Sequence, residues 1–569
     1  MDRNRLLSPC EVQGLVADGQ LIVIHEGHAL KLDRWIDRHP GGRLAILHMV
    51  GRDATDEINV YHFEKTLAIM KAYRIGRVQQ PWTNLEPPIR AGPHRKTLGH
   101  DSDDDDTASS DGNNDDVSIF SAKLDPISSS NSSIGLSDTE LEPAKLAEAR
   151  RRHVAQAVTS APADTTAAEK LPSEKLSRAA YTAALEQKEI ADGIRSYPSL
   201  DPETQQAIRR DYDALHKLVQ EKGYYDCPYL EYGKEMIRYS ILFGLFVYFL
   251  RKEWYITSAA FLGMFWQQIM FSAHDAGHRG ITGDFVIDTV IGAFIADFCC
   301  GLSIGWWKSS HNVHHLITNM PEHDPDIQNI PLFSTSPTYF KSIRSTFYDF
   351  TFYWDKAADV LVPFQKYTYY PVMAIARFNL YLLSWLHLLS PRAAQLGSAW
   401  WTRYLEIAFM ACYWTIFGYG LLIRTLPDWP TRVAFVLVSH MITMILHIQI
   451  TLSHWGMPTS DLGPTESFAQ RQLRTTMDVD CPEWLDFLHG GLQFQAVHHL
   501  FPRVPRHNLR KCQTLVREFC AKTGITYQCQ GFVEGNKVVL TRLEEVAKMV
   551  DTLVQCQKHM AETGESGLH

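Results

Sequence analysis

The sequence predicts a multidomain protein: a small α+β domain, a disordered linker, and an all-α integral membrane domain with four spans and a cytosolic helical cap. Three observations predict this organisation. The chain has 569 residues, more than one ordinary core accommodates. Residues 86–195 are rich in Asp, Ser, Ala and Pro, and the long apolar segments all follow them. We therefore expect boundaries at 1–85, 86–195, 196–530 and 531–569, the last range being a cytosolic tail.

The net charge of −9 arises almost entirely from one segment. The stretch "DSDDDDTASSDGNNDD" (101–116) holds eight aspartates and no basic residue, so the remaining chain carries a charge of −1. This distribution gives no basic patch for nucleic acid. The ten cysteines contain no CxxC motif, which is typical of reduced thiols in a cytosol-facing protein. The first 20 residues lack an apolar core, so we expect no cleaved signal peptide.

Residues 1–85 have the pattern of a compact domain, with a strand in "LIVIHEG" (21–27) and short helices between turns. Residues 86–195 have few aromatic residues and no sustained apolar period, so burial cannot offset their ordering entropy. Order resumes with a helix that Asp201 caps, Pro202 begins and Gly223 ends.

The membrane domain is predicted from two apolar hairpins. The first joins segments 236–250 and 254–273, with Arg238 able to reach the interface, and the second joins 404–423 and 432–453. Residues 284–305 and 376–389 are apolar but short or interrupted by acids, so we expect them at the interface or in re-entrant packing. The alternative is a soluble all-helical protein with buried helices.

Three motifs place histidines at helical spacing, which brings their side chains to one helix face. They are "HDAGH" (274–278), "HNVHH" (311–315) and "QAVHH" (495–499), and "LSHW" adds one more histidine after the fourth span. Each motif follows an even number of spans, so all lie on the same side of the membrane. The residues concerned are His274, His278, His311, His314, His315, His454, His498 and His499, with Gln495 where a further histidine could stand.

Eight convergent imidazoles predict a metal site, because imidazole is a ligand for iron, copper, zinc and nickel. One metal rarely takes more than four or five protein nitrogens, so the number indicates two metals. A zinc hydrolase would use about three ligands per metal and activate water. A dinuclear iron site at a membrane surface instead suits O₂ activation against an unactivated C–H bond of a lipid chain.

The arrangement resembles the membrane fatty-acyl desaturase and hydroxylase superfamily, whose members carry HxxxH, HxxHH and [HQ]xxHH motifs around a di-iron centre. Gln495 within "HGGLQFQAVHHLFP" (489–502) resembles the front-end branch of that superfamily. The resemblance implies iron ligands at His274, His278, His311, His314, His315, His498 and His499, with His454 and Gln495 as further candidates.

Three other histidines have weaker functional readings. His440 and His447 share the spacing of His454 along the fourth span, where they either line a substrate path or are packed and hydrogen-bonded. His489 precedes the third motif and is a candidate outer or direct ligand.

The N-terminal domain contains "HPGG" (39–42), then "DAT", and a second histidine at position 62. This pattern resembles the cytochrome b5 haem-binding domain, which implies His39 and His62 as axial ligands of haem b. Two histidines leave no open position on the iron, which suits electron transfer. Gly41 and Gly42 would let the backbone approach the haem. The pattern departs at Phe63, where a small residue is expected after the ligand.

Together the resemblances imply an O₂-dependent desaturase that receives electrons from its own haem domain. Within the superfamily, the sequence most resembles fungal Δ8 sphingolipid desaturases, through "LSPCEVQGLVADG" (7–19), "LAILHMVGRDATDEI" (44–58) and the acidic linker. The implied substrate is the long-chain base of a ceramide. Alternatives are a front-end Δ5 or Δ6 acyl-lipid desaturase, a lipid hydroxylase and a haem-binding membrane scaffold.

The chain has no dinucleotide-binding motif on a strand–helix unit, so electrons would come from an NADH-cytochrome b5 reductase. We expect an integral membrane protein of the endoplasmic reticulum, with the haem domain and histidine motifs facing the cytosol.

Overall fold

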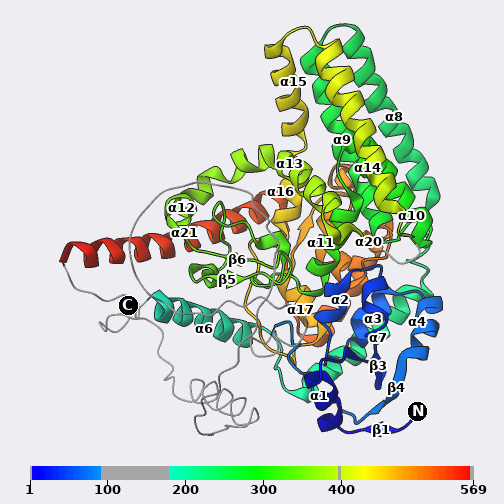
Figure 1. Cartoon of the computed structure of the whole chain (residues 1–569), viewed down its shortest axis with the longest axis vertical. Coiled ribbons are helices and arrows are strands. Elements are labelled where there is room, and N and C mark those ends of the chain that lie inside the picture. Colours follow the sequence, from blue (N-terminus) through cyan, green and yellow to red (C-terminus); the bar gives the residue numbers. More distant parts are fainter. Residues whose placement is uncertain (1–2, 91–177, 395–398, 564–569) are drawn as a thin grey trace, which may run out of the picture. The chain divides into compact units, whose positions relative to one another are not determined.

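The computed structural model describes residues 3–90, 178–394 and 399–563, and all of them belong to one compact unit of the chain (Figure 1). Most of the predicted linker, residues 91–177, lies outside the described residues.

The N-terminal domain is built on a four-stranded sheet in the order β1-β4-β3-β2. Its strands are β1 (Leu6–Leu7), β2 (Ile22–His25), β3 (His28–Lys31) and β4 (Arg74–Val78), and its helices are α1 (Pro9–Ala17), α2 (Arg43–Leu47), α3 (Thr55–Tyr61) and α4 (Glu64–Met70). The predicted strand in 21–27 is present as β2. Glu26 and Gly27, both at positive φ, turn β2 into β3, as a tight hairpin requires.

Two helices follow the undescribed segment. Helix α7 (Pro202–Glu221) begins as predicted: Oδ1 of Asp201 accepts a hydrogen bond from the Thr204 backbone N–H over 2.9 Å, and Gly223 has positive φ where the chain turns away. Helix α6 (Arg178–Ser196) differs from the expectation, because residues 178–195 were assigned to the disordered linker. Its buried Thr182 and Gly193 show that the helix packs against the rest of the protein, as most stable helices do.

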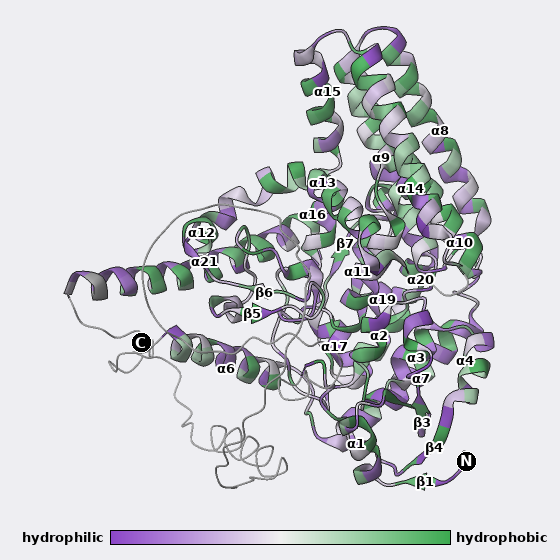
Figure 2. Ribbon diagram, viewed as in Figure 1, coloured by the Kyte–Doolittle hydropathy of each residue, from purple (hydrophilic) through white to green (hydrophobic). Residues whose placement is uncertain are grey.

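The first predicted hairpin forms as two antiparallel helices, α8 (Tyr229–Arg251) and α9 (Tyr255–Gly277). The second contains α14 (Thr402–Tyr413), its π-helical continuation η10 (Trp414–Thr425) and the broken pair α15 (Trp429–Ile442) and α16 (Met444–Leu452). Apolar residues occur along all of these helices (Figure 2). Large apolar side chains such as Ile241, Ile416 and Val433 are more than half exposed, as lipid-facing residues are.

Among the described residues, three helical segments are long and apolar enough to cross a membrane: Lys356–Leu389, Thr402–Thr425 and Trp429–Leu452. A fourth arises if the bent pair Phe285–Cys299 and Ile304–Leu316 counts as one span. The set differs from the predicted one. Helices α8 and α9 are less uniformly apolar because they carry Glu235, Arg238 and the pair Gln267–Gln268. The exact number of spans therefore stays a prediction.

The two segments expected at the interface behave differently. Residues 285–316 form α10 (Phe285–Ala293), π-helical η4 (Phe294–Cys299) and α11 (Ile304–Leu316), with a 116° bend consistent with re-entrant packing. Segment 376–389 is instead the end of a 25-residue helix, α13 (Gln365–Leu389). That helix continues through Pro371, a residue that usually ends helices.

A helical cap surrounds the third histidine motif. It consists of α7, α17 (Phe468–Thr475), α18 (Asp486–His489), α19 (Gln495–Leu500) and α20 (Arg506–Thr523), which share one large hydrophobic core apart from α18. The C-terminal range 531–569 contains a long helix, α21 (Phe532–Thr563), whose Val539, Leu543 and Val546 are fully buried. Helix α21 thus packs into the body of the protein.

Candidate metal centre and haem site

Four elements carry the histidine motifs to one place. His274 lies in the last turn of α9, and His278 is its C-terminal cap before Arg279 turns the chain at positive φ. Helix α11 presents His311, His314 and His315, and α19 presents His498 and His499. His454 follows α16. Residues up to 225 positions apart in sequence therefore converge.

The histidines form two groups. In each group, one ligand atom per residue lies within 4.8 Å of the others. This is close to the roughly 4 Å between nitrogens on opposite sides of one ion. The ring of His315 lies between the groups, with its centroid 4.9 Å from that of His278 and 4.1 Å from that of His499. The first group is His274, His278, His311 and His498, and the second is His314, His454 and His499.

The unsatisfied nitrogens fit metal binding. Buried imidazole nitrogens normally have hydrogen-bond partners. Here one nitrogen in each of six clustered histidines is buried without a partner: His274, His278, His315, His454, His498 and His499. Burial also keeps the pKa of His499 well below its usual value, so this ring is neutral and can donate a lone pair. The residues present therefore fit two ions bound mainly by imidazole.

Two side chains that the motifs do not include orient these rings. Oδ2 of Asp324 lies 2.8 Å from Nδ1 of His314, and Oε1 of Gln472 lies 2.9 Å from Nδ1 of His499. Both contacts leave the Nε2 atoms facing the cluster. Such partners fix the tautomer and the ring direction of a metal ligand. Sequence reasoning missed Gln472, because nothing near it in sequence marks its contact with α19.

Replacing Asp324 by Asn should lower desaturation about 10- to 100-fold, as loss of a partner to a metal ligand typically does. The matched control is Asp326→Asn, since Oδ2 of Asp326 is farther from the same nitrogen, at 3.7 Å, and its side chain is 29% exposed. Product formed per bound iron would be measured for both variants. Equal losses in the two variants would contradict an orienting role specific to Asp324.

A buried ionic network ties the first motif to α20, the helix that follows the third motif. Arg506, at the start of α20, pairs with Asp275 of "HDAGH" and with Glu235 of α8, and all three side chains are at most 11% exposed. Tyr232 also donates to Asp275. Because removing one partner would leave a buried charge uncompensated, the network fixes α9 and α20 relative to each other.

The surroundings of the cluster also include an indole. The Trp307 ring stacks on His311 at a centroid distance of 4.3 Å. A Cβ atom at Gly277 would overlap that ring, so glycine permits this packing. Trp307 thus forms one wall of the first histidine group.

The other candidate histidines lie outside both groups. Nε2 of His440 is 3.2 Å from the Tyr381 hydroxyl, and Nδ1 of His447 is 3.1 Å from the Met373 carbonyl oxygen. His489 contacts Gln449 over 3.0 Å. These contacts favour the packed and hydrogen-bonded interpretation for His440 and His447. His489 is outside both groups of ligand atoms, and its role as an outer ligand stays a prediction. Gln495 is buried at the start of α19, and its coordination stays a prediction.

The N-terminal domain places the rings of His39 and His62 opposite each other, with centroids 6.1 Å apart and planes tilted by 41°. Two metal–nitrogen bonds of about 2 Å each, plus the distances from nitrogen to ring centre, span about 6 Å. Nδ1 of His39 donates to the Gly42 carbonyl and Nδ1 of His62 to the Ile58 carbonyl, over 3.0 and 2.9 Å, which leaves both Nε2 atoms for a metal. A Cβ at Gly41 would lie 2.9 Å from the His39 ring. The pair fits an axially ligated haem.

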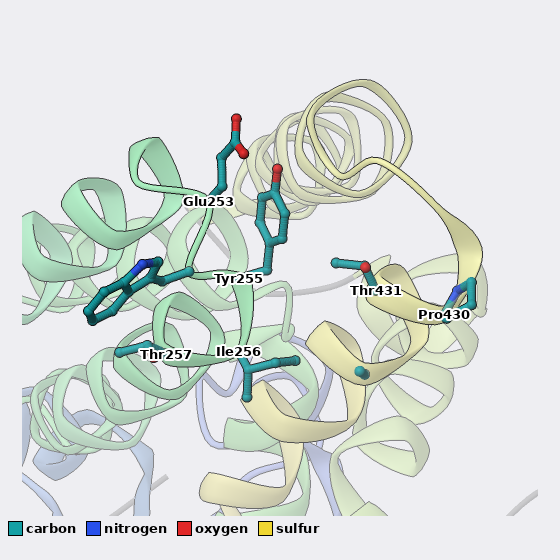
Figure 3. A pocket seen from close by; sticks show the side chains of 8 residues that line it. Glu253, Tyr255, Ile256, Thr257, Pro430 and Thr431 are labelled. Atoms are coloured by element: carbon teal, nitrogen blue, oxygen red, sulfur yellow. The ribbon is translucent and has the colours of Figure 1, made fainter.

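A cavity of about 530 Å³ lies far from these sites, between the α8–α9 turn and the start of α15 (Figure 3). Tyr255 and Ile256 at the first turn of α9 line it, together with Thr431. His274 is 19 residues further along the same helix, about 29 Å at 1.5 Å per residue. The cavity therefore takes no part in the histidine centre.

Comparisons with known proteins agree with this description. The family model described as fatty acid desaturase matches residues 253–531, and the cytochrome b5-like haem/steroid binding domain matches residues 8–79. A Delta 8-(E)-sphingolipid desaturase of Emericella nidulans is 47% identical and covers 100% of this chain and 99% of its own length. One from Komagataella phaffii is 45% identical, over 96% and 94% of the two chains.

A Delta(8)-fatty-acid desaturase of Helianthus annuus is 41% identical over 52% of this chain and 62% of its own length. The full-length similarity to the fungal proteins includes both the N-terminal domain and the helical body. This chain therefore belongs to the fatty acid desaturase family and carries a cytochrome b5-like domain ahead of its desaturase domain.

Proposed function

We propose that the protein is an O₂-dependent desaturase that places a Δ8-(E) double bond in the long-chain base of ceramides. The observation that carries this proposal is the pair of histidine groups, one partly and one fully buried, with unpartnered nitrogens and helices with exposed apolar side chains leading to them. The choice of substrate rests on the fungal relatives, which are sphingolipid desaturases over their full length.

The cofactors are haem b and two iron ions, with O₂ as co-substrate. We assign one iron to His274, His278, His311 and His498, and the other to His314, His454 and His499, with His315 between them and Gln495 as a further ligand. When bound, the irons supply the O₂ chemistry that removes two hydrogens from the lipid chain. His39 and His62 would hold the haem, which would supply one-electron transfer to the histidine centre.

The chain's own residues prepare this chemistry by fixing the ligands in advance. Asp324 and Gln472 set the tautomers of His314 and His499, so both rings offer Nε2 to metal. Trp307 covers one side of the first group with an apolar surface. The fully buried His315 and His499 show that little water reaches this side of the centre.

The protein is an integral membrane protein with a lipid substrate. We further propose four spans, residence in the endoplasmic reticulum, a cytosolic position for both redox sites and reduction by NADH-cytochrome b5 reductase. In the proposed four-span arrangement each histidine motif follows an even number of spans, and the convergence of the histidines fits a common side of the membrane. The ten free cysteines fit a reducing compartment.

An acyl-chain substrate is the second candidate, favoured by the plant relatives named Delta(8)-fatty-acid desaturase. Those proteins match about half of this chain, whereas the sphingolipid enzymes match nearly all of it. The metal chemistry is the same for both substrates, so only the lipid product separates them.

Expression in a yeast that makes no Δ8-unsaturated bases should yield a new trans double bond between C8 and C9 of the sphingoid base, with acyl chains unchanged. Lipid mass spectrometry with double-bond localisation would measure this, and the His311→Ala variant serves as the inactive control. Unsaturation confined to acyl chains would contradict the proposal and favour the second candidate.

A further inference from the structure

The segment Val60–Phe63 of the haem domain lies against the desaturase domain. The Val60 carbonyl oxygen accepts a hydrogen bond from Nε of Arg503 over 2.6 Å. The Val60 side chain is fully buried in the hydrophobic core of the helical cap, with Phe501 and Val504. A haem-domain residue thus belongs to the core beside the third histidine motif, which Arg503 follows by four residues.

Phe63 is held between two arginines of the desaturase domain. The guanidinium carbon of Arg503 lies 4.1 Å from the Phe63 ring centroid, and that of Arg279 lies 4.6 Å from it. Guanidinium groups at such distances attract the face of an aromatic ring. A Cβ atom at Gly283 would lie 3.2 Å from the same ring, so the chain passes close to it there. This contact gives the unexpected Phe63 a physical role.

Tyr61 connects the two redox sites. It directly precedes the haem ligand His62, and its ring meets the His315 ring edge-on, with centroids 6.3 Å apart and planes at 87°. Its hydroxyl is buried without a hydrogen-bond partner, so packing, not hydrogen bonding, holds the ring. One residue therefore links a proposed haem ligand to a proposed iron ligand.

A second set of contacts also joins the haem domain to the desaturase domain. The Asn84 amide donates to the Pro464 carbonyl over 2.9 Å, and the His48 and His323 rings lie 5.2 Å apart. Leu44 packs against Val313 and Ile317, around the second histidine motif. The contacts of Val60–Phe63 are thus part of an extended interface.

We propose that Val60–Phe63 is an interdomain latch: Arg279 and Arg503 hold Phe63, and this docking keeps Tyr61 as the electron-entry contact between His62 and His315. The inference deepens the proposed function and rests on it. Each transfer oxidises the haem iron from Fe(II) to Fe(III) and reduces one iron of the histidine centre from Fe(III) to Fe(II). No covalent bond changes, and an NADH-dependent flavin reductase supplies the next electron to the haem.

The first test uses the full-length, iron- and haem-loaded protein without lipid or O₂. A flash-excited flavin reduces the haem, and the haem absorbance reports how fast the histidine centre reoxidises it. Phe63→Ala should slow this reoxidation by about tenfold or more, because the two sites are no longer held in position. The matched control is Ile69→Ala, an exposed apolar residue on neighbouring α4, which should leave the rate unchanged.

Hydrogen–deuterium exchange supplies a readout that needs no turnover. Phe63→Ala should speed amide exchange in residues 279–283, and Ile69→Ala should not. If Phe63→Ala loses its haem spectrum, Arg279→Gln replaces it, since that variant leaves the haem domain unaltered. If haem reoxidation and amide exchange in Phe63→Ala or Arg279→Gln are as fast as in the Ile69→Ala control, the latch is overturned.

The Tyr61 contact is tested separately. Tyr61→Phe should keep the reoxidation rate, since the hydroxyl has no partner, whereas Tyr61→Ala should slow it without faster exchange at 279–283. A normal rate in Tyr61→Ala would overturn the entry contact. Because none of these measurements uses a lipid, they can succeed even if the sphingoid base proves to be the wrong substrate.

Discussion

His311→Ala and His498→Ala are each expected to abolish desaturation and to lower the non-haem iron content of the protein. Both residues belong to the four-histidine group, in which ligand atoms lie within 4.8 Å of one another. Loss of one ligand leaves the coordination of the iron incomplete. The loss of activity should therefore exceed the roughly 10- to 100-fold loss that is typical when a residue hydrogen-bonded to a ligand is removed. Iron analysis, lipid mass spectrometry and the haem spectrum would be recorded together.

The matched control is His440→Ala, which removes a buried imidazole that hydrogen-bonds to Tyr381 outside both groups. That variant should keep its iron, although packing is disturbed. The haem spectrum should be unchanged in all three variants, because the haem site lies in another domain. Full product yield from both His311→Ala and His498→Ala would rule out the assignment of these residues.

His39→Ala and His62→Ala are expected to remove the bis-histidine haem spectrum and to stop turnover, while leaving the non-haem iron bound. The rings stand 6.1 Å apart, and each Nδ1 is already engaged by a backbone carbonyl. Burial lowers the pKa of His62 to about 3, so a neutral ring with a free lone pair is present at pH 7. In each ring only Nε2 is left to bind the haem iron, because Nδ1 already donates a hydrogen bond to a backbone carbonyl.

The matched control is His28→Ala, which removes a histidine of β3 outside the haem site. It should retain both haem and activity. The activity assay belongs in cells without separate cytochrome b5, because a free electron donor would bypass the fused domain. A bis-histidine spectrum that persists in His62→Ala would show that another residue is the second ligand.

The sequence predicts which histidine side chains lie together within each motif, because spacing along a helix determines which side chains share a face. It also predicts the cap of α7, since Asp201 and Pro202 act locally. The parts it misses depend on tertiary contacts. Gln472 reaches His499 from 27 positions away, and α13 continues through Pro371 where local rules predict an end.

The docking of the haem domain also depends on tertiary contacts that the local sequence does not reveal. Composition predicts a haem domain that a disordered linker joins to the membrane domain, and the structure adds specific docking through Val60 and Phe63. Phe63 could be noticed in the sequence only as a departure from the expected pattern. Its partners Arg279 and Arg503 are more than 200 residues away and carry no signal of that contact.

We propose that one chain carries both a haem and a dinuclear iron centre built from two histidine groups. Metal analysis of the purified full-length protein, combined with its Mössbauer spectrum, tests this most directly. We predict three iron atoms per chain, one as low-spin bis-histidine haem and two as a coupled non-haem pair. Zinc in place of the non-haem iron, or a single uncoupled iron with full activity, would contradict it.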